Sequence, residues 1–190
     1  MLSPLKEIPL LSLEGFGAAF GTRLILSDID LHLEPDGTDV LMGPVKAGKS
    51  TLLRALAGLN DGNPNFRTWG QALVAGQALA QQRPDLVQQH AAIMHASVRD
   101  AVLHHLRKQE QRTVTAWNEL AEQSLAANGL QALAPRLNDP LIEQPVEVQR
   151  AVNILSHALT RPALLMIDEP TYGLSDAAGD TPQNATEAAE

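Results

Sequence analysis

A glycine-rich segment at residues 43–50 has the residue types needed to hold a phosphate group. It reads Gly-Pro-Val-Lys-Ala-Gly-Lys-Ser and fits the pattern G-x-x-x-x-G-K-[ST]. Gly43 and Gly48 let the backbone curl so that consecutive N–H groups face one anion, and a helix beginning near Lys49 adds its positive end. Lys49 would contact the β and γ phosphates, and Ser50 would offer a hydroxyl to Mg²⁺. The residues predicted to bind phosphate are Gly43, Pro44, Val45, Lys46, Ala47, Gly48, Lys49, Ser50 and Thr51.

Two adjacent carboxylates follow a hydrophobic stretch near the end of the chain. Residues 163–167 are typical of a buried strand, and Asp168 and Glu169 come directly after it. Ligands of open α/β sheets bind at the carboxyl ends of strands, so we expect both carboxylates beside the phosphate-binding loop. Asp168 would hold Mg²⁺, often through water, and Glu169 would polarise an attacking water. The alternative for this motif is a strand that ends in an acidic turn.

The elements around these motifs follow from hydrophobic periodicity. Alternation over residues 29–33 predicts a half-buried strand, and the apolar run Val40–Met42 predicts a buried strand just before the loop. Leu52, Leu53 and Leu56 share one helix face, and residues 66–80 are typical of a short strand pair. Three helices are predicted within residues 97–160: one from Ser97 through Leu106 with a capping box, one from Val114 to Asn128, and one around residues 148–159.

Composition excludes several classes of function. The 190 residues carry a net charge of −8, which argues against a nucleic-acid partner, since phosphate surfaces demand a basic stripe. The absence of cysteine excludes disulfides, thiolate zinc sites and a thiol nucleophile, and fits a reducing cytoplasm. The sequence has no apolar run of membrane-spanning length and no signal peptide at its start. The histidines lack metal-ligand spacing, and His90, His95, His104 and His105 are expected at polar surface positions.

The paired motifs resemble the nucleotide-binding domain of ATP-binding cassette (ABC) proteins. The resemblance rests on the phosphate-binding loop (Walker A) and on the segment Asp168-Glu169-Pro170-Thr171 (Walker B and its glutamate), and covers roughly residues 10–176. It implies an α/β fold with a P-loop NTPase core, an N-terminal antiparallel β portion and a helical insert subdomain. It also implies that ATP and Mg²⁺ are the cofactors.

Weaker family positions can be placed by the same resemblance. Phe20 stands where family members put an aromatic that stacks on adenine, although a lone Phe is more often part of a core. Gln89 matches the glutamine that contacts Mg²⁺ and the attacking water, with Gln88 as the competing choice. Gln149 and Arg150 match the end of the family's signature segment. The resemblance thus implies Glu169 and Gln89 as catalytic residues, and Ser50, Gln89 and Asp168 around the metal.

The sequence departs from the family pattern at two places. The signature Leu-Ser-Gly-Gly-Gln binds the γ-phosphate of ATP held by a partner subunit, but this chain has Glu-Gln-Pro-Val-Glu at residues 143–147. Pro145 and Val146 replace glycines, which removes a backbone donor and the close approach that glycine allows. The family's switch histidine has no counterpart after Asp176, so the chain is either truncated relative to its relatives or has lost that half of the site.

These features predict one nucleotide-binding domain over residues 1–176, a helical insert at about residues 90–145 and a disordered acidic tail at 177–190. The resemblance implies head-to-tail pairing with a second ABC subunit, as a homo- or heterodimer, and a cytoplasmic location with an indirect membrane link through a permease on the helical insert. Three functions stay open: an active transport ATPase, a degenerate or weakly active nucleotide-binding regulator, and a different phosphate-loop enzyme such as a small-molecule kinase.

Overall fold

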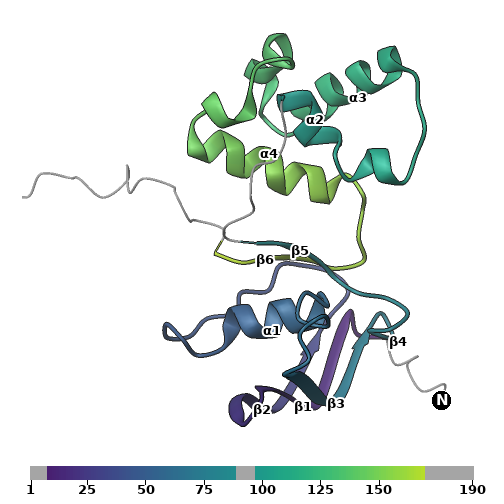
Figure 1. Ribbon diagram of the computed structural model, residues 1–190. Helices are drawn as coiled ribbons and strands as arrows, with labels where there is room; N and C mark the ends of the chain where they lie inside the picture. The colour runs from purple at the N-terminus through teal and green to yellow at the C-terminus, as the bar shows by residue number, and fades with distance from the viewer. Residues whose placement is uncertain (1–7, 89–96, 170–190) are drawn as a thin grey trace, which may run out of the picture.

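The structure, a computed structural model, describes residues 8–88 and 97–169. In Figure 1, a β portion with helix α1 lies at one end, a group of helices lies at the other, and the short strands β5 and β6 lie between them. The strands are β1 (Leu11–Phe20), β2 (Arg23–Leu33), β3 (Phe66–Val74), β4 (Gln77–Ala78), β5 (Asp85–Val87) and β6 (Leu165–Ile167). The α-helices are α1 (Lys49–Leu56), α2 (Val98–Leu103), α3 (Val114–Ala127) and α4 (Val146–Ala158), with short 3₁₀ turns at Leu106–Lys108, Gln131–Arg136 and Leu141–Glu143.

The N-terminal β portion is an antiparallel sheet in the strand order β2-β1-β3-β4. β1 is its buried centre, and Leu13 pairs with Leu31 of β2 and with Ala72 of β3. The backbone of Gly17 lies against Trp69, whose ring occupies the space that a Cβ would need, so a larger residue here would displace this ring. The half-buried strand and the strand pair predicted from the sequence are therefore confirmed.

Helix α1 packs its leucines onto this sheet, as the periodicity predicts. Leu52 and Leu56 are buried in one cluster with Leu13, Phe16 and Leu26. Gly58 follows the helix with φ 75°, in the left-handed region that favours glycine. The cluster also takes in Leu86 of β5 and Met166 of β6, so the sheet, α1 and the two short strands share one core.

Strands β5 and β6 form a parallel pair, with Asp85 opposite Leu165 and Val87 opposite Ile167. The prediction of a buried strand at Val40–Met42 is wrong. In the structure these residues belong to no strand, and Val40 and Met42 are 77% and 84% exposed. An apolar strand is buried only where a neighbour covers it, and within residues 8–88 and 97–169 no strand pairs with this segment.

The helical part has its own core. Val102 of α2, Leu125 of α3 and Val152 of α4 are fully buried in it. Ser97 accepts from the backbone N–H of Asp100 at 3.2 Å, which confirms it as the N-cap, while the Asp100 carboxylate accepts from the Ser97 hydroxyl at 2.8 Å; α2 ends at Leu103 rather than at Leu106. In the part of the chain that the structure describes, no helix combines the length and the hydropathy needed to cross a membrane.

Candidate nucleotide-binding site

The phosphate-binding loop takes the shape that its glycines allow. Lys46 and Gly48 have φ of 67° and 91°, and Gly48 is the N-cap of α1, whose first bond runs from Leu52 N–H to the Gly48 carbonyl at 2.9 Å. A Cβ on Gly48 would lie 2.7 Å from Leu26, so both the backbone angle and the close packing require glycine at this position. The loop is thus anchored on β2 while its tip, Val45, is 87% exposed.

The lysine of the motif lies across its own loop. The ammonium group of Lys49 donates to the carbonyl oxygens of Gly43 at 2.8 Å and of Pro44 at 2.9 Å. Lys49 is half-buried at the start of α1, where the helix also presents free backbone N–H groups. One positive charge and the positive end of a helix therefore meet at the loop, which is the combination that binds phosphate.

The two sequence motifs meet in space. The hydroxyl of Ser50 donates to Oδ1 of Asp168 at 3.1 Å, although the two residues are 118 positions apart. Asp168 follows β6, and its N–H bonds to the carbonyl oxygen of Val87 at 3.0 Å, which extends the β5–β6 ladder by one step. Glu169 comes next, exposed and with φ 48°. The structure thus brings the loop and the first carboxylate together, as the sequence predicts.

A buried arginine fixes the backbone behind these carboxylates. Arg150, on the first half of α4, donates to the carbonyl oxygens of Gln88 at 2.6 Å, Asp168 at 2.7 Å and Glu169 at 3.3 Å. Burial lowers the pKa of Arg150, and the charge of Asp168 opposes this effect. The sequence marks position 150 only through the family signature, and no local pattern predicts that its guanidinium holds the main chain at the ends of two strands.

The predicted adenine contact has a partner inside the protein. The ring of Phe20 lies against that of Phe66 with 4.9 Å between centroids and 48° between planes. Phe20 is half-buried at the end of β1, in the same hairpin as Ile25 and Leu26, which touch Gly48. The hairpin that carries Phe20 thus also supplies side chains that pack against the loop at Gly48. Gln89, Pro170 and Thr171 lie outside the described residues, whereas Gln88 contributes its backbone carbonyl to Arg150.

The segment that stands in place of the signature is held by Gln149. The side-chain amide of Gln149 donates to the carbonyl oxygens of Gln144 at 2.6 Å and Ile142 at 3.1 Å. Pro145 is the N-cap of α4 and makes no side-chain cap bond, and Val146 next to it is 47% exposed. This end of α4 therefore presents proline and valine, next to the exposed Glu143, in place of two glycines.

Comparisons with known proteins agree with this geometry. The model of the ABC transporter family matches residues 26–172. The phosphate import ATP-binding protein PstB 1 of Streptococcus pyogenes serotypes M1, M3 and M18 is 27% identical over 176 residues, which cover 87% of this chain and 70% of that protein. A solved structure described as a metal-chelate type ABC transporter in an inward-facing conformation has a TM-score of 0.68 at 22% identity.

The match to the solved structure covers 88% of this chain but spans only 63% of the length of that one, and at this identity it shows the fold alone. The family match covers both the phosphate-binding loop and Asp168-Glu169, the two motifs that the fold brings together. The chain belongs to the ABC transporter family and carries the features of its ATP-binding domain.

Proposed function

We propose that this chain is an ATP-binding subunit of an ABC-type system, which binds Mg-ATP and hydrolyses it with a partner subunit to drive a membrane transporter. The contact between Ser50 and Asp168 at 3.1 Å is the observation that carries most of the proposal. A hydroxyl next to a carboxylate, beside a loop crossed by Lys49, suits a triphosphate that arrives with a divalent cation.

The donor set fits Mg²⁺. Ser50 and Asp168 offer hard oxygen ligands, which this cation prefers, and the hydrogen bond between them already brings the two oxygens together. These two residues and Gln89 would hold the ion. When bound, Mg²⁺ would neutralise negative charge on the phosphate oxygens.

The other steps of nucleotide binding and hydrolysis are assigned to residues of this chain. Lys49 and the N–H groups of the loop hold the β and γ phosphates, and Phe20 stacks on the adenine ring. Glu169 orients the attacking water and takes up its proton, as ATP and water become ADP and phosphate. Arg150 holds the backbone of Asp168 and Glu169 in place.

The partners and location belong to the same proposal. Residues 1–176 form the nucleotide-binding domain, and its helical insert docks on a permease at the cytoplasmic face of the membrane. A second subunit, identical or different, faces the phosphate-binding loop. The curated relatives named above are phosphate import ATP-binding proteins, which supports an import system.

A degenerate regulatory module is the second candidate, and the start of α4 favours it. Pro145 caps this helix, Glu147 lies in its first turn and Glu143 lies just before it. Negative charge and a missing backbone donor oppose the binding of a partner's γ-phosphate there.

Mg-dependent nucleotide binding tests the proposal. Calorimetry should show that the chain binds ATP more tightly with Mg²⁺ than with EDTA. Asp168→Asn should remove most of that difference, because an amide oxygen is a weaker ligand than a carboxylate. Asp139→Asn, at an exposed ion pair with Arg136, is the matched control and should keep it. Equal ATP binding with and without Mg²⁺ in the unaltered chain would contradict the proposed site.

A further inference from the structure

Helix α4 is fastened to strand β5 at two points. Near its start, Arg150 bonds to the carbonyl oxygen of Gln88, just after the carboxyl end of β5. Seven residues later, Nδ1 of His157 lies 2.8 Å from Oδ2 of Asp85, the first residue of β5. The two contacts are seven residues apart on the helix, about 10.5 Å, and three residues apart on the strand, about 10 Å. Their spacing along α4 therefore matches their spacing along β5. Together they fix where α4 lies along the strand.

His157 and Asp85 form a hydrogen bond in which the imidazole donates to the carboxylate. Burial alone would raise the pKa of Asp85, but the hydrogen bond and charge of His157 and the N–H of Leu86 outweigh it and lower the pKa. Asp85 is therefore an ionised acceptor at neutral pH. His157 is buried and must carry a hydrogen on Nδ1 to make this contact.

The ring of a second histidine, His105, packs against the ring of His157. The rings of His105 and His157 are 3.9 Å apart between centroids and tilted by 35°, and Nδ1 of His105 lies 3.0 Å from Oγ of Ser156. Burial lowers the pKa of His105 to about 4, and the charges of His157, His104 and Lys108 act in the same direction, against Asp85. His105 is thus neutral at pH 7, and a proton on it would place a positive charge in a half-buried position against the ring of His157.

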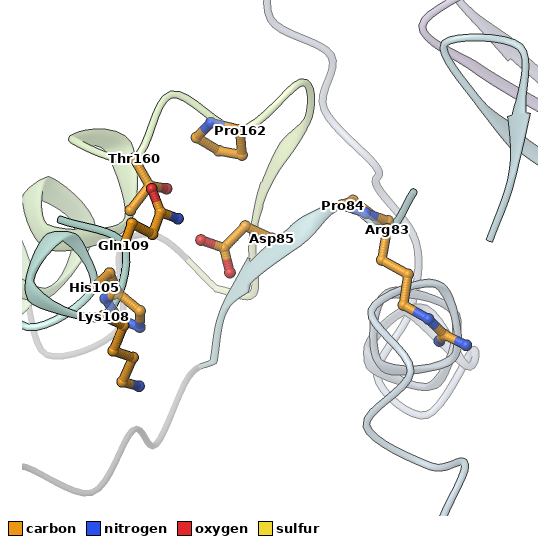
Figure 2. Close-up of a pocket in the computed structure, with 8 residues that line it drawn as sticks. All are labelled: Arg83, Pro84, Asp85, His105, Lys108, Gln109, Thr160 and Pro162. Atoms are coloured by element: carbon orange, nitrogen blue, oxygen red, sulfur yellow. The ribbon is translucent and has the colours of Figure 1, made fainter. Parts of the chain in front are cut away.

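Solvent reaches this cluster through an open cavity of about 360 Å³. Figure 2 shows the carboxylate of Asp85 directed toward His105 and Gln109, while the side chain of Arg83 extends away from it. Arg83 makes its ion pair elsewhere, with Asp61 at 2.7 Å. Because β5 and β6 are parallel, the cavity lies at their amino ends, whereas Asp168 and Glu169 follow the carboxyl end of β6.

We propose that Asp85 and His157 are positioning residues that hold α4 in register with β5, so that Arg150 keeps Asp168 and Glu169 in place, and that protonation of His105 loosens this hold. The inference rests on the proposed function insofar as the residues positioned are those of the ATP site. The cluster lies at the amino ends of β5 and β6, whereas the proposed nucleotide site lies at the carboxyl end of β6. Its effect passes along α4, from His157 to Arg150.

Amide hydrogen exchange of residues 165–169 tests the positioning directly, without need of ATP. His157→Ala should speed exchange there about tenfold or more at pH 7, since hydrogen bonds to charged groups are the stronger ones. His157→Gln, which keeps a donor, should restore most of the protection. Gln109 lines the same cavity, so Gln109→Ala is the matched control and should leave exchange unchanged.

The pH dependence separates positioning from a merely structural role. In the unaltered chain, protection of residues 165–169, corrected for intrinsic rates, should fall between pH 7 and pH 4.5, and His105→Asn should flatten that fall. If His157→Ala does not fold, Asp85→Glu and His157→Gln carry the comparison. The inference is overturned if these variants lower Tm while residues 165–169 keep their protection and its pH dependence. If the unaltered chain does not bind Mg-ATP, the proposed function is refuted, but the exchange result still tests the positioning of residues 165–169.

Discussion

Arg150 and Asp168 are joined through the main chain: Nη2 of Arg150 donates to the carbonyl oxygen of Asp168 at 2.7 Å. The carboxylate of Asp168 remains available to Ser50, 3.1 Å away. A direct Arg–Asp ion pair would have occupied the oxygen that the proposed site needs. Holding the backbone instead fixes the position of the carboxylate and leaves its chemistry intact.

Arg150→Lys should therefore destabilise the chain although it keeps the charge. A lysine cannot reproduce the planar fork that bonds to Gln88 and Asp168 together, and the loss of one charge-assisted bond costs about 1.5–3 kcal/mol. Urea unfolding measures the difference in free energy. Arg136→Lys, at an exposed ion pair, should change it by less than about 0.5 kcal/mol. Equal stabilities for the two variants would contradict the importance of the fork.

Lys49→Ala should weaken Mg-ATP binding about tenfold or more without unfolding the chain, because a charge-assisted contact to phosphate is worth roughly 1.5–3 kcal/mol. Calorimetry measures the affinity and circular dichroism the fold. Arg54→Ala removes an exposed cation from the same helix and should leave the affinity unchanged. Unaltered ATP affinity in a folded Lys49→Ala variant would falsify the assignment of the phosphate-binding loop.

Phe20→Ala should weaken ATP binding, whereas Phe20→Tyr and Phe20→Trp should preserve it. The expected contact is with the ring face, so the preference for ATP over GTP should be slight. Phe66→Ala separates binding from stability, because it removes the same aromatic pair but not the proposed stacking ring. If Phe66→Ala weakens ATP binding as much as Phe20→Ala does, Phe20 acts through the core alone.

The purified chain should hydrolyse Mg-ATP very slowly by itself. In a homodimer, each site would receive the proline-capped segment at residues 143–147 in place of two glycines, and loss of one preorganised donor costs roughly 10²–10³-fold in rate. A phosphate-release assay measures the turnover. A partner with an intact signature should raise it, and Glu169→Gln should abolish what remains.

Brisk hydrolysis by the chain alone, lost in Glu169→Gln, would show that the altered signature does not limit turnover. Hydrolysis that survives Glu169→Gln would point to a contaminating ATPase or to another group that activates the water. Asp61→Asn, far along the sequence from Glu169 and paired with Arg83, is a suitable control for general effects of removing one acidic charge.

Stability should fall as the pH drops from about 6.5 toward 4. The pKa of His105 is lowered to about 4 from the usual 6.5, so the unfolded chain binds the proton first, and the stabilising contribution is complete above pH 6.5 and lost below pH 4. Thermal melts across this range measure the slope, and His105→Asn should reduce it. His32→Asn, on a more exposed position of β2, should not. The same slope in both variants would rule out His105 as its source.

Local features of the fold are the ones that the sequence predicts well. The loop at residues 43–50 and its helix follow from Gly48, Lys49 and the leucine period, all within a few residues of one another. The contact of Ser50 with Asp168 is expected from the rule that ligands bind at the carboxyl ends of strands, and it forms although the strand predicted before the loop is wrong.

Long-range packing is what the sequence does not reveal. The run at Val40–Met42 has the composition of a buried strand, but burial depends on a neighbour that residues 8–88 and 97–169 do not supply. The sequence predicts a polar surface position for His105, but this residue is half-buried and stacks on His157, 52 positions later in the chain. Neither the missing neighbour nor the histidine contact leaves a periodic signal in the sequence, because both depend on elements far apart in the chain.

The exposed side chains of Val40, Met42 and Val45 have a consequence for the protein as a solute. Salts such as sulfate, which are excluded from the protein surface, strengthen the association of exposed apolar surfaces on different molecules. This association also increases with protein concentration. The net charge of −8 opposes that attraction by mutual repulsion, which weakens as salt screens it. Low protein concentration, low salt and neutral pH therefore keep the molecules apart. High protein concentration, high salt or acidic pH favours self-association and precipitation.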